Sequence, residues 1–148
     1  MINTLLVSVA ILLFIALVSA ESMKFTTCEP PATQIFEVEN IDFDVPTPHP
    51  GQNVTITITG KATIDTPGGI LTSKIYKASV NLFTYKYDIC AITKGGCPIK
   101  AGQVVTSTFV QKTPTFAFPG EYVAKSLVAD LDDNPLSCTS VDITVVRK

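Results

Sequence analysis

Four cysteines are the side chains with the most distinctive chemistry in this 148-residue sequence. Cys90 and Cys97 enclose six residues, two of which are glycines. Because glycine readily adopts positive φ, a loop this short can bring two thiols within bonding reach. Three pairings of four cysteines are possible, and proximity favours a Cys90–Cys97 disulfide, which leaves Cys28 to pair with Cys138.

Metal and catalytic chemistry have weak support. The sequence has no C-x-x-C pair, and its one histidine, His49, lies in the proline-rich turn Pro46–Gly51. A zinc site and a nucleophile with a histidine base are therefore not expected. Asp130, Asp132 and Asp133 fall in a predicted hairpin turn, where exposure to water gives no reason for a raised pKa. We expect no enzyme, no metal and no cofactor.

The N-terminal segment has the pattern of a targeting signal. Leu5–Val18 is a mostly apolar run followed by Ser19 and Ala20, a pattern that predicts a secretory signal peptide over residues 1–20 and a mature domain over 21–148. A retained membrane anchor is the competing interpretation, for which the run is short. Secretion is consistent with disulfides, so we expect a secreted or lumenal protein, the endolysosomal lumen included. Asn53 begins an N-x-T glycosylation sequon.

Short β-branched runs separated by Pro, Gly and Asn predict an all-β domain. In Asn53–Thr63, Val54, Ile56 and Ile58 alternate with threonines, as in a strand with one buried face. The other predicted strands are Gln34–Val45 with a bulge, Ile70–Tyr87 as one segment or two, Val104–Val110, Glu121–Leu131 and Leu136–Val146. Strands that are apolar on one side at this spacing predict an antiparallel β-sandwich.

Aromatic residues cluster on either side of the cysteine loop. Phe83, Tyr85 and Tyr87 precede it, and Phe116 and Phe118 lie in a loop bounded by prolines. A loop that only connects strands is usually polar, so these rings are candidates for an apolar binding surface. The alternative is that they cap the hydrophobic core.

Lysines are concentrated in the same part of the chain. Six lysines lie between Lys74 and Lys112 against one acid, Asp88, although the net charge of the chain is −2. This pattern suits an apolar ligand with an anionic head group, or an anionic membrane surface, and a solvated face is the alternative. The overall charge gives no reason to expect a nucleic-acid partner.

Three motifs together resemble a known family. They are FDVPTPHPGQNVTITITG, DIC…CPIKAG and FPGEYVAKSLVADLDD. The chain resembles the ML-domain lipid-recognition family, the group of the Niemann-Pick type C sterol carrier, and within it the secreted phosphatidylglycerol/phosphatidylinositol transfer proteins. The resemblance covers residues 28–146 and implies an immunoglobulin-like sandwich whose sheets splay around an apolar cavity. It implies the same two disulfides. The sterol carriers have a third disulfide near the first turn, where this chain has no cysteine, which favours a phospholipid ligand.

We therefore expect a monomeric carrier that binds one lipid, phosphatidylglycerol or phosphatidylinositol, and contacts membranes transiently. The alternatives are a sterol carrier of the same fold and an immunoglobulin-like recognition module with a filled core. The expected cavity residues are Val54, Ile56, Ile58, Val80, Leu82, Val105, Phe109, Leu127 and Val141. The expected mouth residues are Phe83, Tyr85, Phe116 and Phe118. The lysines expected to attract the head group are Lys86, Lys94, Lys100 and Lys112.

Overall fold

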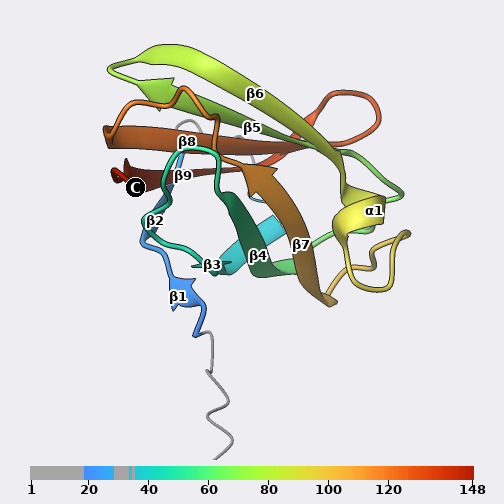
Figure 1. Ribbon diagram of the computed structural model, residues 1–148. Helices are drawn as coiled ribbons and strands as arrows, with labels where there is room; N and C mark the ends of the chain where they lie inside the picture. Colours follow the sequence, from blue (N-terminus) through green and yellow to red (C-terminus); the bar gives the residue numbers. More distant parts are fainter. Residues whose placement is uncertain (1–18, 29–33, 35) are drawn as a thin grey trace, which may run out of the picture.

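The computed structural model describes residues 19–28, 34 and 36–148, so the signal peptide predicted over residues 1–20 lies almost entirely outside the described residues. The described strands form two antiparallel sheets packed face to face (Figure 1). The four-stranded sheet has the order β1 (Glu21–Ser22), β3 (Phe36–Phe43), β4 (Asn53–Ala62) and β7 (Val104–Lys112). The five-stranded sheet has the order β2 (Phe25–Thr27), β9 (Pro135–Val145), β8 (Gly120–Ala129), β5 (Ile70–Lys77) and β6 (Val80–Asp88). The predicted β-sandwich is confirmed.

Strand β4 lies at the centre of the four-stranded sheet, between β3 and β7. Its alternation is as predicted, because Val54, Ile56 and Ile58 are all buried. The bulge predicted in the strand before it is present between Val38 and Asn40. Gly60 permits the close approach there, since a Cβ at this position would lie 2.4 Å from the carbonyl oxygen of Glu37.

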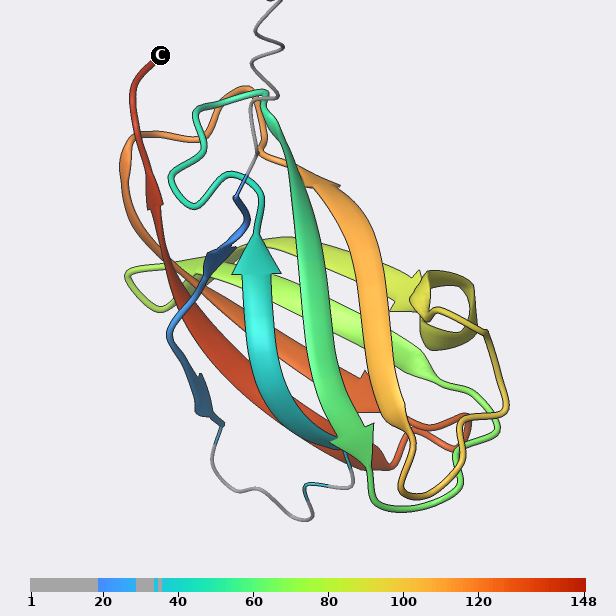
Figure 2. The ribbon, with the colours of Figure 1, turned by 90° about the horizontal axis from the view of Figure 1, so that it is seen from below.

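The segment Ile70–Tyr87, predicted as one strand or two, belongs to two strands, β5 and β6. Ala78 and Ser79 have φ values of 47° and 69°, which is the conformation of a two-residue hairpin turn that matches the twist of its strands. The sequence contains neither Asn-Gly nor Asp-Gly at this point, so the usual signal of such a turn is absent. Figure 2 shows the resulting β5–β6 hairpin crossing behind the strands of the other sheet.

The two sheets meet along one side through their edge strands, β6 and β7. The chain passes between them through a one-turn helix that the sequence did not lead us to expect, α1 (Ile89–Ile92). Asp88 caps this helix by accepting a hydrogen bond from the backbone N–H of Cys90 at 2.8 Å. The predicted Cys90–Cys97 disulfide closes the loop that follows. We call the contact between β6 and β7 the seam.

On the other side of the sandwich, the predicted Cys28–Cys138 disulfide links the end of β2 to β9. The backbone N–H of Cys28 also donates to the carbonyl of Cys138 at 3.1 Å. Both predicted pairings are confirmed, and the described residues include no free cysteine. In the described part of the chain, no helix is long and apolar enough to cross a membrane.

We predict that the two disulfides differ in their contribution to stability. Cys28 and Cys138 are 110 residues apart in sequence, whereas Cys90 and Cys97 are 7 apart. Because a crosslink restricts the unfolded chain more when its loop is longer, replacing the first pair by serine should cost about 4–5 kcal/mol and the second about 2–3 kcal/mol. Urea denaturation of the two double variants measures the difference. Equal losses would contradict this account of the long-range disulfide.

Candidate functional site

The interior between the sheets contains two adjoining cavities. The first cavity opens near the loops at one end of the sandwich. Its volume, measured as the space open to the centre of a water-sized sphere, is about 60 Å³. Its lining is mainly apolar and comes from both sheets. The lining residues are Ile41, Phe43, Pro48, Val54, Ile56, Ile58, Ser73, Ile75, Phe83, Tyr85, Phe109, Gln111, Thr113, Pro114, Ala117, Tyr122, Ala124, Ser126, Val141, Ile143 and Val145.

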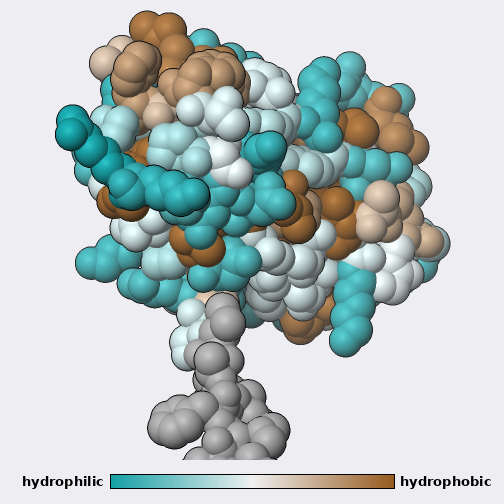
Figure 3. All heavy atoms as spheres, viewed as in Figure 1, coloured by the Kyte–Doolittle hydropathy of each residue, from teal (hydrophilic) through white to brown (hydrophobic). Residues whose placement is uncertain are grey.

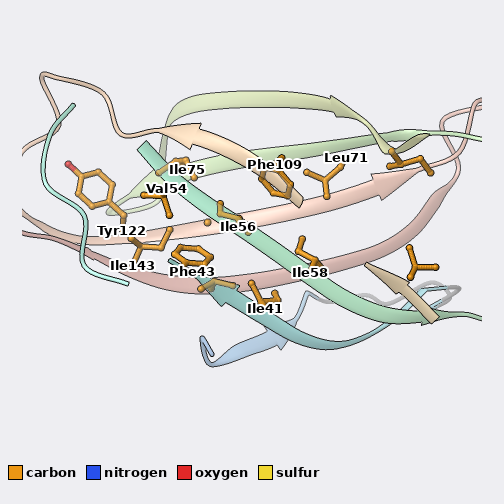
Figure 4. Packing of buried hydrophobic residues seen from close by; sticks show 14 of the residues in the cluster. Ile41, Phe43, Val54, Ile56, Ile58, Leu71, Ile75, Phe109, Tyr122 and Ile143 are labelled. Atoms are coloured by element: carbon orange, nitrogen blue, oxygen red, sulfur yellow. The ribbon is translucent and has the colours of Figure 1, made fainter. Parts of the chain in front are cut away.

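The second cavity lies toward the cysteine loop and measures about 50 Å³ on the same scale. It mixes apolar side chains with several Ser and Thr hydroxyls. The lining residues are Phe36, Val38, Ile58, Ala62, Thr66, Leu71, Ile89, Ile92, Thr93, Ile99, Val105, Ser107, Ser126, Val128, Leu136, Ser137 and Thr139. Figure 4 shows Val54, Ile56 and Ile58 in line along β4, with Tyr122 toward the first cavity and Leu71 toward the second.

Two hydrogen-bonded loops form the outer end of the first cavity. The backbone N–H of Gly51 donates to the carbonyl of Thr113 at 2.9 Å, which joins the proline-rich turn to the start of the phenylalanine loop. Ala117 N–H donates to the carbonyl of Pro114 at 3.0 Å. The hydroxyl of Tyr122 donates to the carbonyl of Phe118 at 2.7 Å. The phenylalanine loop, residues 113–119, is therefore braced by hydrogen bonds on both sides of its turn.

The structure brings the four predicted mouth residues to this end. Phe116 and Phe118 point outward and are 71% and 75% exposed, while Phe83 and Tyr85 line the first cavity. The rings of Phe83 and Phe116 lie edge to face with centroids 5.6 Å apart. The phenylalanine loop therefore contacts β6 directly beside the first cavity.

Side chains hold the seam closed along this cavity. The Tyr85 hydroxyl of β6 donates to the carbonyl of Lys112 in β7 at 3.2 Å, and the Tyr87 and Phe109 ring centroids are 4.4 Å apart. Partial burial raises the pKa of the Tyr85 phenol above its usual range, so the hydroxyl keeps the proton that it donates. Burial also raises the pKa of Tyr87, with a smaller effect from the charge of Tyr85.

The structure places six of the nine expected cavity residues in the lining. Val54, Ile56, Ile58, Phe109 and Val141 line the first cavity. Ile58 also lines the second cavity, together with Val105.

The expectation for Val80 and Leu82 is wrong, because these side chains are 59% and 44% exposed and line neither cavity. The hairpin turn sets the orientation of β6. Phe83 is paired with the buried Ile75, and Tyr85 with the buried Ser73, so the odd-numbered residues of β6 face inward from Phe83 onward.

The expectation for Leu127 is also wrong, since this side chain is 38% exposed. In β8 the inward positions are Tyr122 and Ala124, which pair directly with the buried Ile143 and Val141 of β9. Residues paired across a sheet share a face. Val123 and Leu127, at outward positions, are larger aliphatic residues than the inward Ala124, and for this reason the sequence pattern pointed to the wrong face of β8.

The four expected head-group lysines do not form one surface. Lys112 ends β7 beside the first cavity, but the backbone N–H of Lys94 donates to the carbonyl of Thr106, near the start of that strand. The two sites are six residues apart along β7, about 20 Å at the usual rise per residue. Lys100 lies at the same end as Lys94, 3.2 Å from the carboxylate of Asp65, and Lys86 lies on the outer face of β6. Of these four lysines, only Lys112 lies next to residues that line the first cavity, Gln111 and Thr113.

Another lysine, absent from the expected set, lies beside this cavity. The Nζ of Lys77 is 4.3 Å from the centre of the Tyr122 ring, a cation–π distance. Gln111 also lines the cavity, and its amide oxygen is buried without a hydrogen-bond partner in the described residues. Gln111 follows the parity of Val105, Ser107 and Phe109 in β7, which is the signal that could have identified it.

The residues considered for catalysis in the sequence, His49 and the aspartates of the predicted hairpin turn, do not come together in a site. The Nδ1 of His49 lies 3.0 Å from the carbonyl of Pro50 in its own turn. Hydrogen bonds from the side chain and backbone of Asn134 hold the pKa of Asp130 below its usual range, the reverse of what a general acid needs. The described residues contain no group of three or more His, Cys, Asp or Glu side chains that could hold a metal ion.

Comparison with known proteins gives a family match over most of the chain. A family model described as ML domain matches residues 22–145. A Dictyostelium discoideum relative, named "Putative phosphatidylglycerol/phosphatidylinositol transfer protein 1", is 26% identical over 137 residues, which cover 93% of this chain and 90% of the relative. A Yarrowia lipolytica relative named phosphatidylglycerol/phosphatidylinositol transfer protein is 26% identical over 121 residues, covering 79% and 64% of the two chains.

A solved structure shares the fold. The crystal structure of a Niemann-Pick type C2 protein from Japanese carpenter ant superposes with a TM-score of 0.70 at 9% identity. The superposition covers 83% of this chain and 99% of that one. At this identity, the likeness shows a common fold.

We predict opposite outcomes for the same substitution at Ile58 and Leu127. Ile58→Asp places a charge in the interior and should cost more than about 4 kcal/mol of unfolding free energy or prevent folding. Leu127→Asp alters an outward side chain and should cost about 1 kcal/mol or less. Thermal and urea denaturation compare the two variants. Equal damage at both positions would mean that Leu127 belongs to the core.

Proposed function

The chain belongs to the ML-domain family, and from that membership we propose that it binds one lipid between its two sheets and carries it between membranes. The observation that carries this proposal is the pair of adjoining, mainly apolar cavities in the interior of the sandwich. Acyl chains gain roughly 25 cal/mol for each Å² of apolar surface removed from water there. The names of the two relatives point to phosphatidylglycerol or phosphatidylinositol as the ligand.

Binding requires the sheets to move apart. The cavities measure about 60 and 50 Å³, whereas ligand pockets usually measure about 300–1,000 Å³. The seam is the place where this opening is least costly, because β6 and β7 are edge strands of different sheets held by the contacts of Tyr85 and Tyr87. The lipid is transferred by partition, so no bond is made or broken.

The phenylalanine loop is the part of the mouth that meets the membrane. Phe116 and Phe118 expose most of their surface, and large exposed apolar groups mark interaction sites. Figure 3 shows apolar side chains gathered at the upper left, where Figure 1 has the start of β6. Val80 and Leu82, which are exposed at the start of that strand, extend the apolar surface beside the loop.

The head group lies at the same end. The Nζ of Lys77 lies over the ring of Tyr122, which lines the first cavity, and Lys112 lies between the lining residues Gln111 and Thr113. These two lysines supply positive charge for an anionic phosphate. The buried amide oxygen of Gln111 accepts a hydrogen bond from a hydroxyl of the glycerol or inositol.

The site of action is a secreted or lumenal compartment, the endolysosomal lumen included, in which the protein acts as a monomer. The two disulfides support this, because they persist in oxidising compartments. Residues 1–20 serve as the signal peptide. Asn53 is exposed at the start of β4, as a glycosylated residue must be.

We predict that replacing Phe116 and Phe118 together by serine slows phosphatidylglycerol transfer between vesicles about tenfold or more, because each ring contributes 1.5 kcal/mol or more when buried in a bilayer. The melting temperature should change by less than about 4 °C, since neither side chain packs in the core.

The matched control replaces Val104 and Leu131 by serine. These side chains are 64% and 69% exposed, and they lie at the end of the sandwich with the cysteine loop. Transfer by this variant should match that of the unmodified protein. An equal loss in both variants would show that general surface hydrophobicity, and not the phenylalanine loop, drives the contact.

We also predict that Lys77→Gln with Lys112→Gln weakens the preference for phosphatidylglycerol over phosphatidylcholine vesicles by about fivefold per lysine, since each cation near an anionic surface contributes about 1 kcal/mol. The preference of the unmodified protein should shrink as salt rises, because exposed charges are screened over about 8 Å at physiological ionic strength.

Lys94→Gln with Lys100→Gln removes the same charge from the other end and serves as the control. If this control weakens the preference as much as the mouth variant does, the effect depends on net charge alone.

A further inference from the structure

The two cavities meet at two side chains from opposite sheets. Ile58 of β4 and Ser126 of β8 line both the first and the second cavity, so these residues separate the two spaces. Along β4, the first cavity extends from Val54 to Ile58 and the second from Ile58 to Ala62. Each interval is four residues, or about 13 Å at the usual rise of a strand.

Small side chains surround this boundary. Ser126 pairs with Ser73 of β5 on one side and with Thr139 of β9 on the other. On the opposite sheet, Ile58 pairs with Ser107 of β7. Ser73, Ser107 and Thr139 are all buried. The boundary therefore combines one large aliphatic side chain with a belt of hydroxyl residues, and it leaves room that a larger residue at Ser126 would fill.

The second cavity suits the methyl end of an acyl chain. Leu71, Ile99, Val105 and Leu136 supply apolar surface. The Thr93 and Ser107 hydroxyls, which also line it, are 2.8 Å apart and hydrogen-bond to each other. Such paired hydroxyls need no partner from a ligand.

We propose that the boundary between Ile58 and Ser126 sets the acyl-chain length that the protein accepts. This inference rests on the proposed lipid-binding function. A short chain is held in the first cavity alone, whereas a long chain passes between Ile58 and Ser126 and places its methyl end in the second cavity. The size of residue 126 then decides how many methylenes are buried.

The test compares decanoate and palmitate binding by calorimetry, using the unmodified protein and Ser126→Leu. Each methylene kept out of an apolar site lowers affinity about fourfold. The palmitate-to-decanoate affinity ratio should therefore fall at least tenfold in Ser126→Leu. The matched control is Ser140→Leu, which adds the same side chain on the outer face of β9, next to the buried Val141, and should keep the ratio of the unmodified protein.

The outcomes separate this inference from the proposed function. If the unmodified protein binds neither fatty acid nor phosphatidylglycerol, the proposed function fails and the inference with it. If it binds both fatty acids and Ser126→Leu keeps the original ratio, only the inference is overturned. An equal loss of both ligands in folded Ser126→Leu also overturns it, because the interior would then act as one space. If Ser126→Leu does not fold, Ile58→Phe narrows the same boundary from the other sheet, and the same fall in the ratio is expected.

Discussion

A mismatch in side-chain size between the two sheets determines the interior of this protein. Ile56 and Ile58 of β4 line the same cavity as Ala124 and Ser126 of β8. Sheets that pack face to face are about 10 Å apart, and their inward side chains normally fill the space. Here the small residues of β8 leave part of it unfilled. Atoms that line such a void lose dispersion contacts, and a ligand that fills it restores them and stabilises the fold.

The seam, the contact between β6 and β7, is held differently at its two ends. At one end, the chain connects β6 to β7 through α1 and a loop that the Cys90–Cys97 disulfide closes. Toward the other end, the strands are held by the hydrogen bond of Tyr85 and the ring contact of Tyr87. In the proposed function, the sheets open beside the phenylalanine loop, whose exposed aromatic rings would contact the membrane. The cavities also oppose the alternative of a recognition module with a filled core.

The features that the sequence predicted well are those with a strong local signal. The β4 alternation needs only its own residues, and a loop as short as the one after Cys90 permits few pairings.

The predictions for Val80, Leu82 and Leu127 failed because their orientation depends on neighbouring strands. The sequence allowed two strands in Ile70–Tyr87, but it did not indicate the position of the turn, because Ala78–Ser79 contains no glycine. In β8, the inward face carries Ala124 and Ser126, which are less apolar than the outward Val123 and Leu127. When the residues of a strand that line a cavity are small, the alternation of apolar residues in the sequence does not identify the inner face of that strand. The lysines were grouped by sequence position, whereas β7 separates them along its length.

Native mass spectrometry tests the central claim most directly. The purified protein is incubated with vesicles that contain phosphatidylglycerol, phosphatidylinositol, phosphatidylcholine and cholesterol, then separated from them and weighed under non-denaturing conditions. The account predicts one bound lipid per chain, with phosphatidylglycerol or phosphatidylinositol as the adduct. A bare protein mass after this exposure would contradict lipid carriage, and a cholesterol adduct in its place would assign the cavity to a sterol.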